Sequence, residues 1–177
     1  LNDYVKEHGL FFSPELSTSN RATIGGMINT DASGQGSLRY GKTSAHVIDL
    51  KLVLADGSQL DTAFPETAAP GSFAQMALIE TERVCRDNRQ LIEDKFPNLN
   101  RFLTGYDLKN ALVDGKFDAK RVLCGSEGSL GFITEAKLNL TPIPKVRVLV
   151  NVKYDSFDSA LRSAPMMVEA KALSVET

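Results

Sequence analysis

Residues 14–34 combine a dense row of hydroxyl and amide side chains with two adjacent glycines. The segment reads PELSTSNRATIGGMINTDASG. Hydroxyl groups and main-chain N–H groups are the partners that an uncharged polar heterocycle and a polyhydroxylated chain need. Gly25 and Gly26 lack a Cβ atom, so a flat ligand can approach the main chain closely. A helix that begins there also offers free N–H groups to an anion. The alternative, a polar surface loop that only caps a helix, stays open on composition alone.

A second glycine-rich stretch, residues 124–135, reads CGSEGSLGFITE. Three glycines within seven residues, between two expected strands, form either a plain turn or a main-chain cradle for a ligand. The stretch is not a phosphate-binding P-loop, because Gly-Lys-Ser/Thr is absent. It is not a dinucleotide fingerprint either, because no helix follows and the glycine spacing differs.

The remaining reactive side chains are expected to be structural. His8 is expected at the surface, and His46 is expected to be a turn residue rather than a general base. Cys85 and Cys124 have no CxxC spacing and no neighbouring histidine, so they predict neither a disulfide framework nor metal ligands. The charged residues between 80 and 89 are expected on a solvated helix face, as pairs spaced i,i+3 or i,i+4. No catalytic residue and no metal ligand is identified in the sequence.

Helices and strands must position the two stretches. The first nine residues are expected to end a helix stopped by Gly9, and residues 13–46 form a polar loop too long to be a passive connection. A strand pair flanking Asp56-Gly57 is a hairpin signal. The expected helices are 23–29, 72–92 and 156–170, and the expected strands are 47–54, 59–62, 121–124, 132–140, 146–152 and a further one from 172.

Composition indicates a globular chain without a strong charge bias. Hydrophobic residues make up 42% and charged residues 24% of the 177, and the formal net charge is −2. Duplex nucleic acid is therefore an unlikely partner, and no apolar run of about 18 residues predicts a membrane span. With two isolated cysteines, a reduced cytoplasmic setting fits best. The chain starts inside an expected helix and ends inside an apolar run, so we expect a fragment of a longer protein.

Taken together, the two glycine-bearing stretches resemble one family. The order PELSTSNRATIGGMINTDASG, then RYG, then GSEGSLGFITEAKLNLTPIP is similar to the FAD-linked oxidases, whose flavin domain is of the p-cresol methylhydroxylase/vanillyl-alcohol oxidase type. The likeness covers roughly residues 10–60 and 119–177. Residues 102–108, FLTGYDL, resemble a segment of the D-2-hydroxyglutarate and D-lactate dehydrogenase branch.

The resemblance implies an α+β fold, the second subdomain of that flavin domain followed by the start of an α+β cap domain. The expected division is 1–144 for the FAD-binding domain, truncated on its N-terminal side, and 145–177 for the beginning of the cap, with the boundary at Pro142–Pro144. It also implies roles for single residues. The cofactor-binding residues implied are Pro14, Ser17, Thr18, Ser19, Asn20, Thr23, Gly25, Gly26, Thr30, Asp31, Ala32, Ser33, Glu127, Gly128 and Ile133. Pro14 and residues 17–23 would line the flavin and its ribityl chain, and Gly25 and Gly26 would lie against the cofactor. Residues 30–33 would contact the pyrophosphate or ribityl side. Glu127, Gly128 and Ile133 would hold the ring edge and the adenosine side through main-chain groups.

The function implied is FAD-dependent oxidation of a D-2-hydroxyacid, by hydride transfer from the substrate C2 to flavin N5. A 2-hydroxyglutarate-like substrate is preferred over D-lactate or glycolate because of TGYDLKNAL, residues 104–112. The family's phosphate loop is expected to precede this chain, and its catalytic histidines, substrate arginines and an iron–sulfur domain are expected to follow it. The isolated chain is therefore expected to be inactive and to hold FAD weakly.

Two hypotheses other than a D-2-hydroxyacid oxidoreductase remain. A non-catalytic nucleotide-binding or assembly module would keep the fold without the chemistry, and the flavin domain of a cell-wall enolpyruvyl reductase shares the fold. The flanking sequence would discriminate them. The electron acceptor and the oligomeric state are not readable from the sequence, and membrane association of the longer protein is left open.

Overall fold

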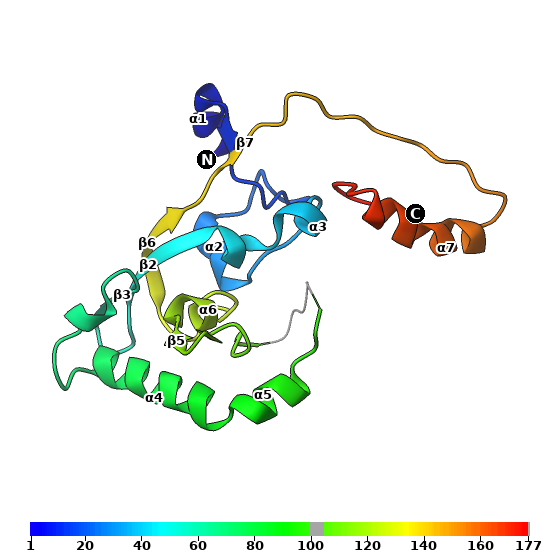
Figure 1. Ribbon diagram of the computed structural model, residues 1–177. Coiled ribbons are helices and arrows are strands. Elements are labelled where there is room, and N and C mark those ends of the chain that lie inside the picture. The colour runs from blue at the N-terminus through cyan, green and yellow to red at the C-terminus, as the bar shows by residue number, and fades with distance from the viewer. Residues whose placement is uncertain (100–104, 177) are drawn as a thin grey trace.

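The computed structural model describes residues 1–99 and 105–176. Its centre is a three-stranded antiparallel sheet in the order β3-β2-β6 (Figure 1). The strands are β2 (Val47–Val53), β3 (Gln59–Asp61) and β6 (Phe132–Leu138). In the register, Leu52 lies opposite Leu60 on one side and Ile133 on the other. The expected hairpin of residues 47–62 is confirmed.

One face of the sheet forms the main core. Leu50 and Leu52 are buried on either side of the exposed Lys51 in β2, so their side chains point to the same face. Three helices cover this face and contribute Ile28, Ala74 and Leu123 to the core. These helices are α2 (Ile24–Asn29), α4 (Phe73–Asp87) and α6 (Ala119–Leu123). The sheet thereby fixes α2 and the residues that follow α6, which belong to the two glycine-bearing stretches.

Shorter elements complete the body. At the N-terminus, α1 (Asn2–Val5) and a three-ten turn end at Gly9, which has a φ of 71°. The expected helix stop is confirmed. Next, β1 (Leu10–Phe11) pairs with β7 (Thr141–Pro142), which brings both ends of the body together. The polar loop contains α3 (Ser37–Tyr40) and a three-ten turn at 43–46.

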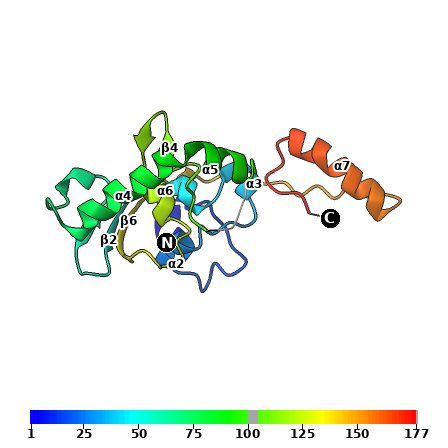
Figure 2. The ribbon, with the colours of Figure 1, turned by 90° about the horizontal axis from the view of Figure 1, so that it is seen from below.

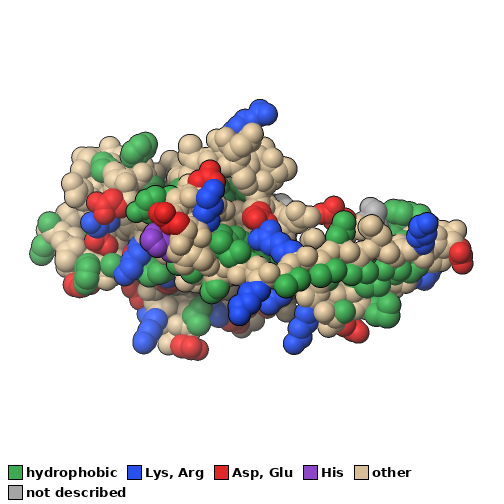
Figure 3. Space-filling view, turned by 90° about the horizontal axis from the view of Figure 1, so that it is seen from above, with side chains coloured by type: hydrophobic (Ala, Val, Ile, Leu, Met, Phe, Trp, Pro, Cys, Tyr) green, Lys and Arg blue, Asp and Glu red, His purple; other side chains and the backbone are tan. Residues whose placement is uncertain are grey.

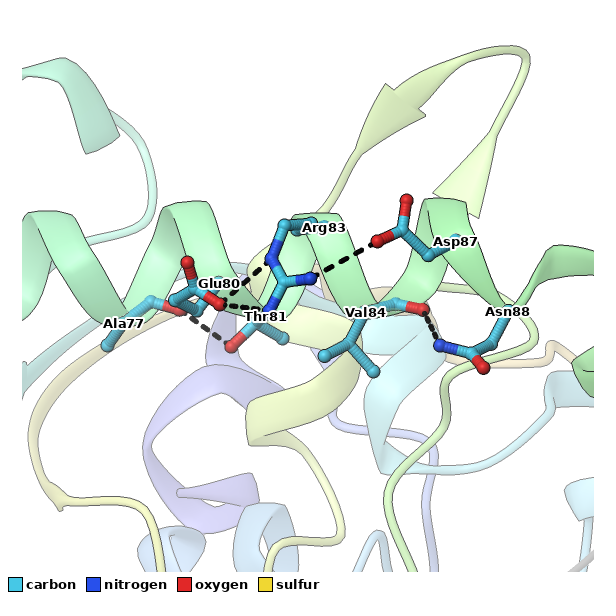
Figure 4. Close-up of polar contacts among 7 residues, drawn as sticks. All are labelled: Ala77, Glu80, Thr81, Arg83, Val84, Asp87 and Asn88. Atoms are coloured by element: carbon cyan, nitrogen blue, oxygen red, sulfur yellow. Dashed lines mark hydrogen bonds and ion pairs between the residues drawn. The ribbon is translucent and has the colours of Figure 1, made fainter.

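Helix α4 begins at Ser72, whose hydroxyl accepts a hydrogen bond from the Gln75 N–H. On its outer face, the Arg83 guanidinium lies 2.6 Å from a Glu80 carboxylate oxygen and 3.3 Å from one of Asp87 (Figure 4). The expected solvated face with i,i+3 and i,i+4 pairs is confirmed. The expectation of one helix over 72–92 is wrong, because the chain leaves helical geometry at Asn88 before α5 (Arg89–Lys95).

Two further expectations about this region are corrected. Residues 121–124 are not a strand: they lie largely in α6, which begins where the Asp118 carboxylate accepts a hydrogen bond from the Lys120 N–H. The cap starts a helix that the apolar pattern did not reveal. A short hairpin, β4 (Leu112–Val113) and β5 (Lys116–Phe117), was also missed. Its turn residues Asp114 and Gly115 both have positive φ, as a type I′ turn requires.

The chain after β7 runs away from the body, and its last described residues return to the α3 region (Figure 2). Residues 146–152 are extended but form no strand with any described residue, so the strand expectation is wrong there, and it is wrong also for 172–176. A strand needs a neighbour to complete its ladder, and the apolar side chains of 146–152 instead lie exposed, Leu149 at 86%. They form a continuous apolar row in Figure 3. The expected helix is present as α7 (Phe157–Glu169), capped by Ser156.

Candidate cofactor site

The two glycine-bearing stretches adjoin at the C-terminal end of α2. The N–H of Gly125 donates to the Ile28 carbonyl at 2.9 Å, and the N–H of Glu127 donates to the Asn29 carbonyl at 2.8 Å. Gly125 has a φ of 82°, and a Cβ there would lie 3.3 Å from the Cβ of Asp31. A side chain at position 125 would therefore crowd the contact between the stretches.

A third segment, residues 105–107, closes this region. The Tyr106 hydroxyl lies 2.9 Å from the Ser129 hydroxyl. Asp107 is buried, and its carboxylate accepts hydrogen bonds from the Asn110 N–H and side-chain amide. Its role is thus local capping. The first residues of the FLTGYDL motif, 102–104, lie outside the described residues.

Between these segments lies a small hollow. Its volume is about 20 Å³, which is room for one group the size of a water molecule. A larger hollow of about 550 Å³ lies between the α3 region and the end of the chain, within the size range of small-molecule sites. The small hollow is lined by Thr30, Asp31, Lys42, Gly105, Asp107, Cys124, Gly125 and Glu127, and the larger one by residues 34–38, Lys42, Val168 and 173–176.

Asp31 is held rigidly next to the small hollow. Its backbone is left-handed, with a φ of 44°. One carboxylate oxygen accepts a hydrogen bond from the Ser44 N–H at 2.8 Å, and the other forms an ion pair with the Lys42 ammonium. Both the N–H and the hydroxyl of Thr43 donate to the Ala32 carbonyl. The carboxylate of Asp31 therefore serves to position residues 30–33.

The first predicted residues lie on a different part of the surface. Residues 17–20 form an exposed turn, in which the Ser19 hydroxyl donates to the Leu16 carbonyl and accepts from the Leu16 N–H. Pro14 is buried. Gly34 packs so tightly that a Cβ would lie 2.0 Å from the Glu15 carbonyl oxygen. This contact joins the two ends of the 14–34 segment.

The start of α2 combines a filled cap with open space. The Thr23 hydroxyl accepts the hydrogen bond of the Gly26 N–H, so this donor is already used. Around Gly25, a Cβ would meet no atom within 4 Å. A flat ligand could therefore approach the main chain at Gly25, as the sequence suggested. The six-residue helix itself offers little macrodipole.

The three cofactor residues predicted in the second stretch, Glu127, Gly128 and Ile133, differ in their surroundings. Glu127 and Gly128 are exposed and left-handed, with φ values of 54° and 76°. Ile133 is half-buried, pairs with Leu52 in the sheet and packs against the main core. Its side chain is thus committed to the core, whereas Glu127 lines the small hollow.

The structure contains features that fit a bound polar cofactor. The side-chain oxygen of Asn29 is buried and has no hydrogen-bond partner among the described residues. An unpaired buried acceptor costs about 1–3 kcal/mol, so a donor from a ligand or water would stabilise it. Sequence reasoning missed Asn29, Lys42 and Gly34. For Asn29 and Gly34 the signal was present, because both lie inside the quoted 14–34 motif.

Cys124 and His46 are both buried, and each has a structural environment. Burial raises the pKa of the Cys124 thiol to about 12, which favours an inert thiol. The ring of His46 is buried, and its Nε2 lies 2.8 Å from the Tyr40 carbonyl oxygen and 3.1 Å from the Ser13 hydroxyl. His46 therefore links the start of the polar loop at Ser13 to Tyr40 at the end of α3.

Comparison with known proteins finds similarity to flavin-binding proteins. Residues 1–63 match the family described as FAD binding domain. The chain is 62% identical over 185 residues to D-2-hydroxyglutarate dehydrogenase of Pantoea ananatis (strain AJ13355), and 61% identical to that of Escherichia coli (strain K12). It is 29% identical over 169 residues to the glycolate oxidase subunit GlcD of Bacillus subtilis (strain 168). The predicted resemblance to FAD-linked oxidases, closer to the hydroxyglutarate branch, is confirmed.

Each alignment covers a much larger share of this chain than of the relative. Both dehydrogenase alignments cover 100% of this chain but 18% of the relative, and the GlcD alignment covers 96% of this chain and 27% of the relative. The chain thus spans about a fifth of the length of the dehydrogenases it matches. Of the helices in the described part of the chain, none is long and apolar enough to cross a bilayer. The described side chains also include no group of three His, Cys, Asp or Glu placed to hold a metal.

Proposed function

We propose that this chain forms part of the FAD-binding unit of an oxidoreductase that oxidises a D-2-hydroxyacid, with 2-hydroxyglutarate as the preferred substrate. The observation that carries the proposal is the identity of 61–62% to two D-2-hydroxyglutarate dehydrogenases over the whole chain. The lower identity of 29% to GlcD makes glycolate a weaker candidate. FAD, when bound, accepts the hydride from the substrate carbon.

Residues of three segments would hold the cofactor. Gly25 leaves open space at the start of α2, residues 29–31 meet the glycine turn at 125–128, and Lys42 lies between the two hollows. The larger hollow is the one with room for a heterocyclic ring. The remaining predicted cofactor residues, including Ser17–Asn20 and Ile133, stay part of this proposal with weaker support from their positions.

The division of the chain belongs to the same proposal. Residues 1–144 would form the flavin-binding unit, corresponding to the second subdomain of its type, and 145–177 would begin the substrate cap. The larger hollow supports this division, because one wall comes from residues 34–38 with Lys42 and the other from Val168 with residues 173–176. The exposed apolar row of 146–152 also fits a segment that completes its sheet with further chain.

The test is substrate-dependent dye reduction by the full-length protein. We expect flavin absorbance in the purified protein and a higher kcat/KM with D-2-hydroxyglutarate than with D-lactate or glycolate. A protein that binds FAD but oxidises none of the three would favour the non-catalytic module instead. A protein without any affinity for FAD would overturn the proposal.

A further inference from the structure

The turn formed by residues 126–129 has a backbone shape that one of its residues does not favour. The Ser129 N–H donates to the Ser126 carbonyl at 3.0 Å, and the two central residues have positive φ, 54° at Glu127 and 76° at Gly128. This is the pattern of a type I′ turn. Glycine adopts positive φ freely, whereas the Cβ of a glutamate crowds the main chain there. The turn is therefore strained at Glu127, and contacts around it must stabilise its shape.

The hydroxyl of Ser129 closes the turn a second time. It donates to the Ser126 carbonyl at 2.6 Å, so this carbonyl accepts from both the side chain and the main chain of Ser129. A serine hydroxyl has a single proton, so toward the Tyr106 hydroxyl, 2.9 Å away, Ser129 can only accept. Two hydrogen bonds thus run in sequence, from Tyr106 to Ser129 and from Ser129 to the Ser126 carbonyl. We call these two bonds the hydroxyl relay.

The relay starts from a segment that is itself held in place. On one side of Tyr106, the Gly105 carbonyl oxygen would lie 3.8 Å from a Cβ at Gly125, just before the turn. On the other side, Asp107 is buried and its carboxylate accepts the Asn110 N–H. The ring of Tyr106 is 40% exposed, so its hydroxyl bond is the main polar link between this segment and the turn. A donor on a fixed segment can restrain the acceptor that it reaches.

We propose that Tyr106 and Ser129 are positioning residues, whose hydroxyl relay holds Glu127 and Gly128 in the left-handed shape that the cofactor site requires. The inference rests on the proposed FAD binding. Tyr106 acts through Ser129 and does not touch the cofactor. Without the relay, the strained turn of the flavin-free protein leaves this shape for part of the time. The apparent affinity for FAD then falls by the fraction of molecules that lose it.

The test uses the full-length protein freed of flavin and titrated with FAD, followed by flavin fluorescence. Tyr106→Phe keeps the ring and removes the hydroxyl, and we expect an about three- to tenfold higher Kd, the range of one net hydrogen bond. Ser129→Ala breaks both bonds of the relay and should raise the Kd at least as much. The double variant should bind no more weakly than Ser129→Ala alone, because both changes break the same relay. An unchanged Kd for Tyr106→Phe, or penalties that add in the double variant, overturn the inference.

A change at the strained position distinguishes positioning of the turn from a general structural role. Glu127→Asn creates Asn-Gly, the pair that type I′ turns prefer. In this background, Tyr106→Phe should raise the Kd by less than about twofold, because the turn then keeps its shape without the relay. A penalty as large as in the wild-type background would show that Tyr106 does not act on the strained turn, and would overturn the inference.

A control variant and the wild type complete the experiment. Tyr4→Phe removes a hydroxyl from a tyrosine that is 72% exposed on α1, and should leave the Kd unchanged. Tyr106 lies outside both apolar clusters, so thermal unfolding of flavin-free Tyr106→Phe should resemble that of the wild type. A wild-type protein without affinity for FAD overturns the proposed function and this inference together. Normal FAD binding by both the wild type and Tyr106→Phe overturns the inference alone.

Discussion

The ammonium of Lys42 and the carboxylate of Asp31 form an ion pair in which the two side chains are 13% and 9% exposed. The pair ties the residue that follows α2 and its C-cap to the segment that leads into β2. Asp31 also accepts the Ser44 N–H and adopts a left-handed backbone. The main-chain shape of the segment around Asp31 therefore depends on a charged pair within the protein.

Removing this carboxylate should be costly. Asp31→Ala is expected to lower the free energy of unfolding by about 3 kcal/mol, because Lys42 stays buried after losing its carboxylate. Asp31→Asn should cost less, since asparagine tolerates positive φ and can still accept from Ser44. Urea denaturation measures both. A loss below about 0.5 kcal/mol for the alanine variant would show that the pair contributes little.

Two glycines should respond in opposite ways to the same substitution. Gly34→Ala should destabilise the protein by about 1–3 kcal/mol, because the new Cβ would lie 2.0 Å from the Glu15 carbonyl oxygen. Gly25→Ala should instead stabilise the flavin-free protein by up to about 1 kcal/mol, because it sits in a helix with free space. Thermal unfolding compares the two. If Gly25 faces the flavin, its variant should also bind FAD more weakly, and unchanged FAD affinity would remove Gly25 from the site.

The Cys124 thiol should make stability depend on alkaline pH. Burial raises the pKa of this group from 9.0 to about 12, so only the unfolded chain releases the proton between these values. Its contribution is therefore complete below pH 9 and is lost as the pH rises toward 12, at up to about 1.4 kcal/mol per pH unit. Denaturant midpoints from pH 7.5 to 10.5 should fall more for the wild type than for Cys124→Ala. Parallel midpoint curves would contradict the raised pKa.

Ser13 should matter more than its exposed neighbours. Its hydroxyl accepts a hydrogen bond from the Thr141 hydroxyl at 3.0 Å and contacts the ring of His46. Ser13→Ala is expected to cost about 1–2 kcal/mol of unfolding free energy, because it leaves buried polar groups unpaired. Ser17→Ala, at an exposed position of the same loop, serves as the matched control and should change stability by less than about 0.5 kcal/mol.

Patterns that depend on neighbours in sequence were predicted well. The hairpin of 47–62, the short helix after Thr23 and the stop at Gly9 follow from alternation, a capping hydroxyl and a glycine with positive φ. The expectation failed for 121–124, where the Asp118 cap decided for a helix, and for 146–152, where no neighbouring strand is present among the described residues. Strand formation is a pairing event that one segment cannot determine alone.

The sequence by itself predicted the resemblance to FAD-linked oxidases, because residue types and their order along the chain carry the motif. The tertiary structure alone decided which motif residues lie together, since that depends on packing between segments about 100 residues apart. It joined Asn29 to Glu127 by a main-chain hydrogen bond, turned Ile133 into the core, and committed the carboxylate of Asp31 to Lys42. A main-chain donor or a charged group that is paired inside the protein is not available to a ligand. Only the folded chain shows which of these groups are paired.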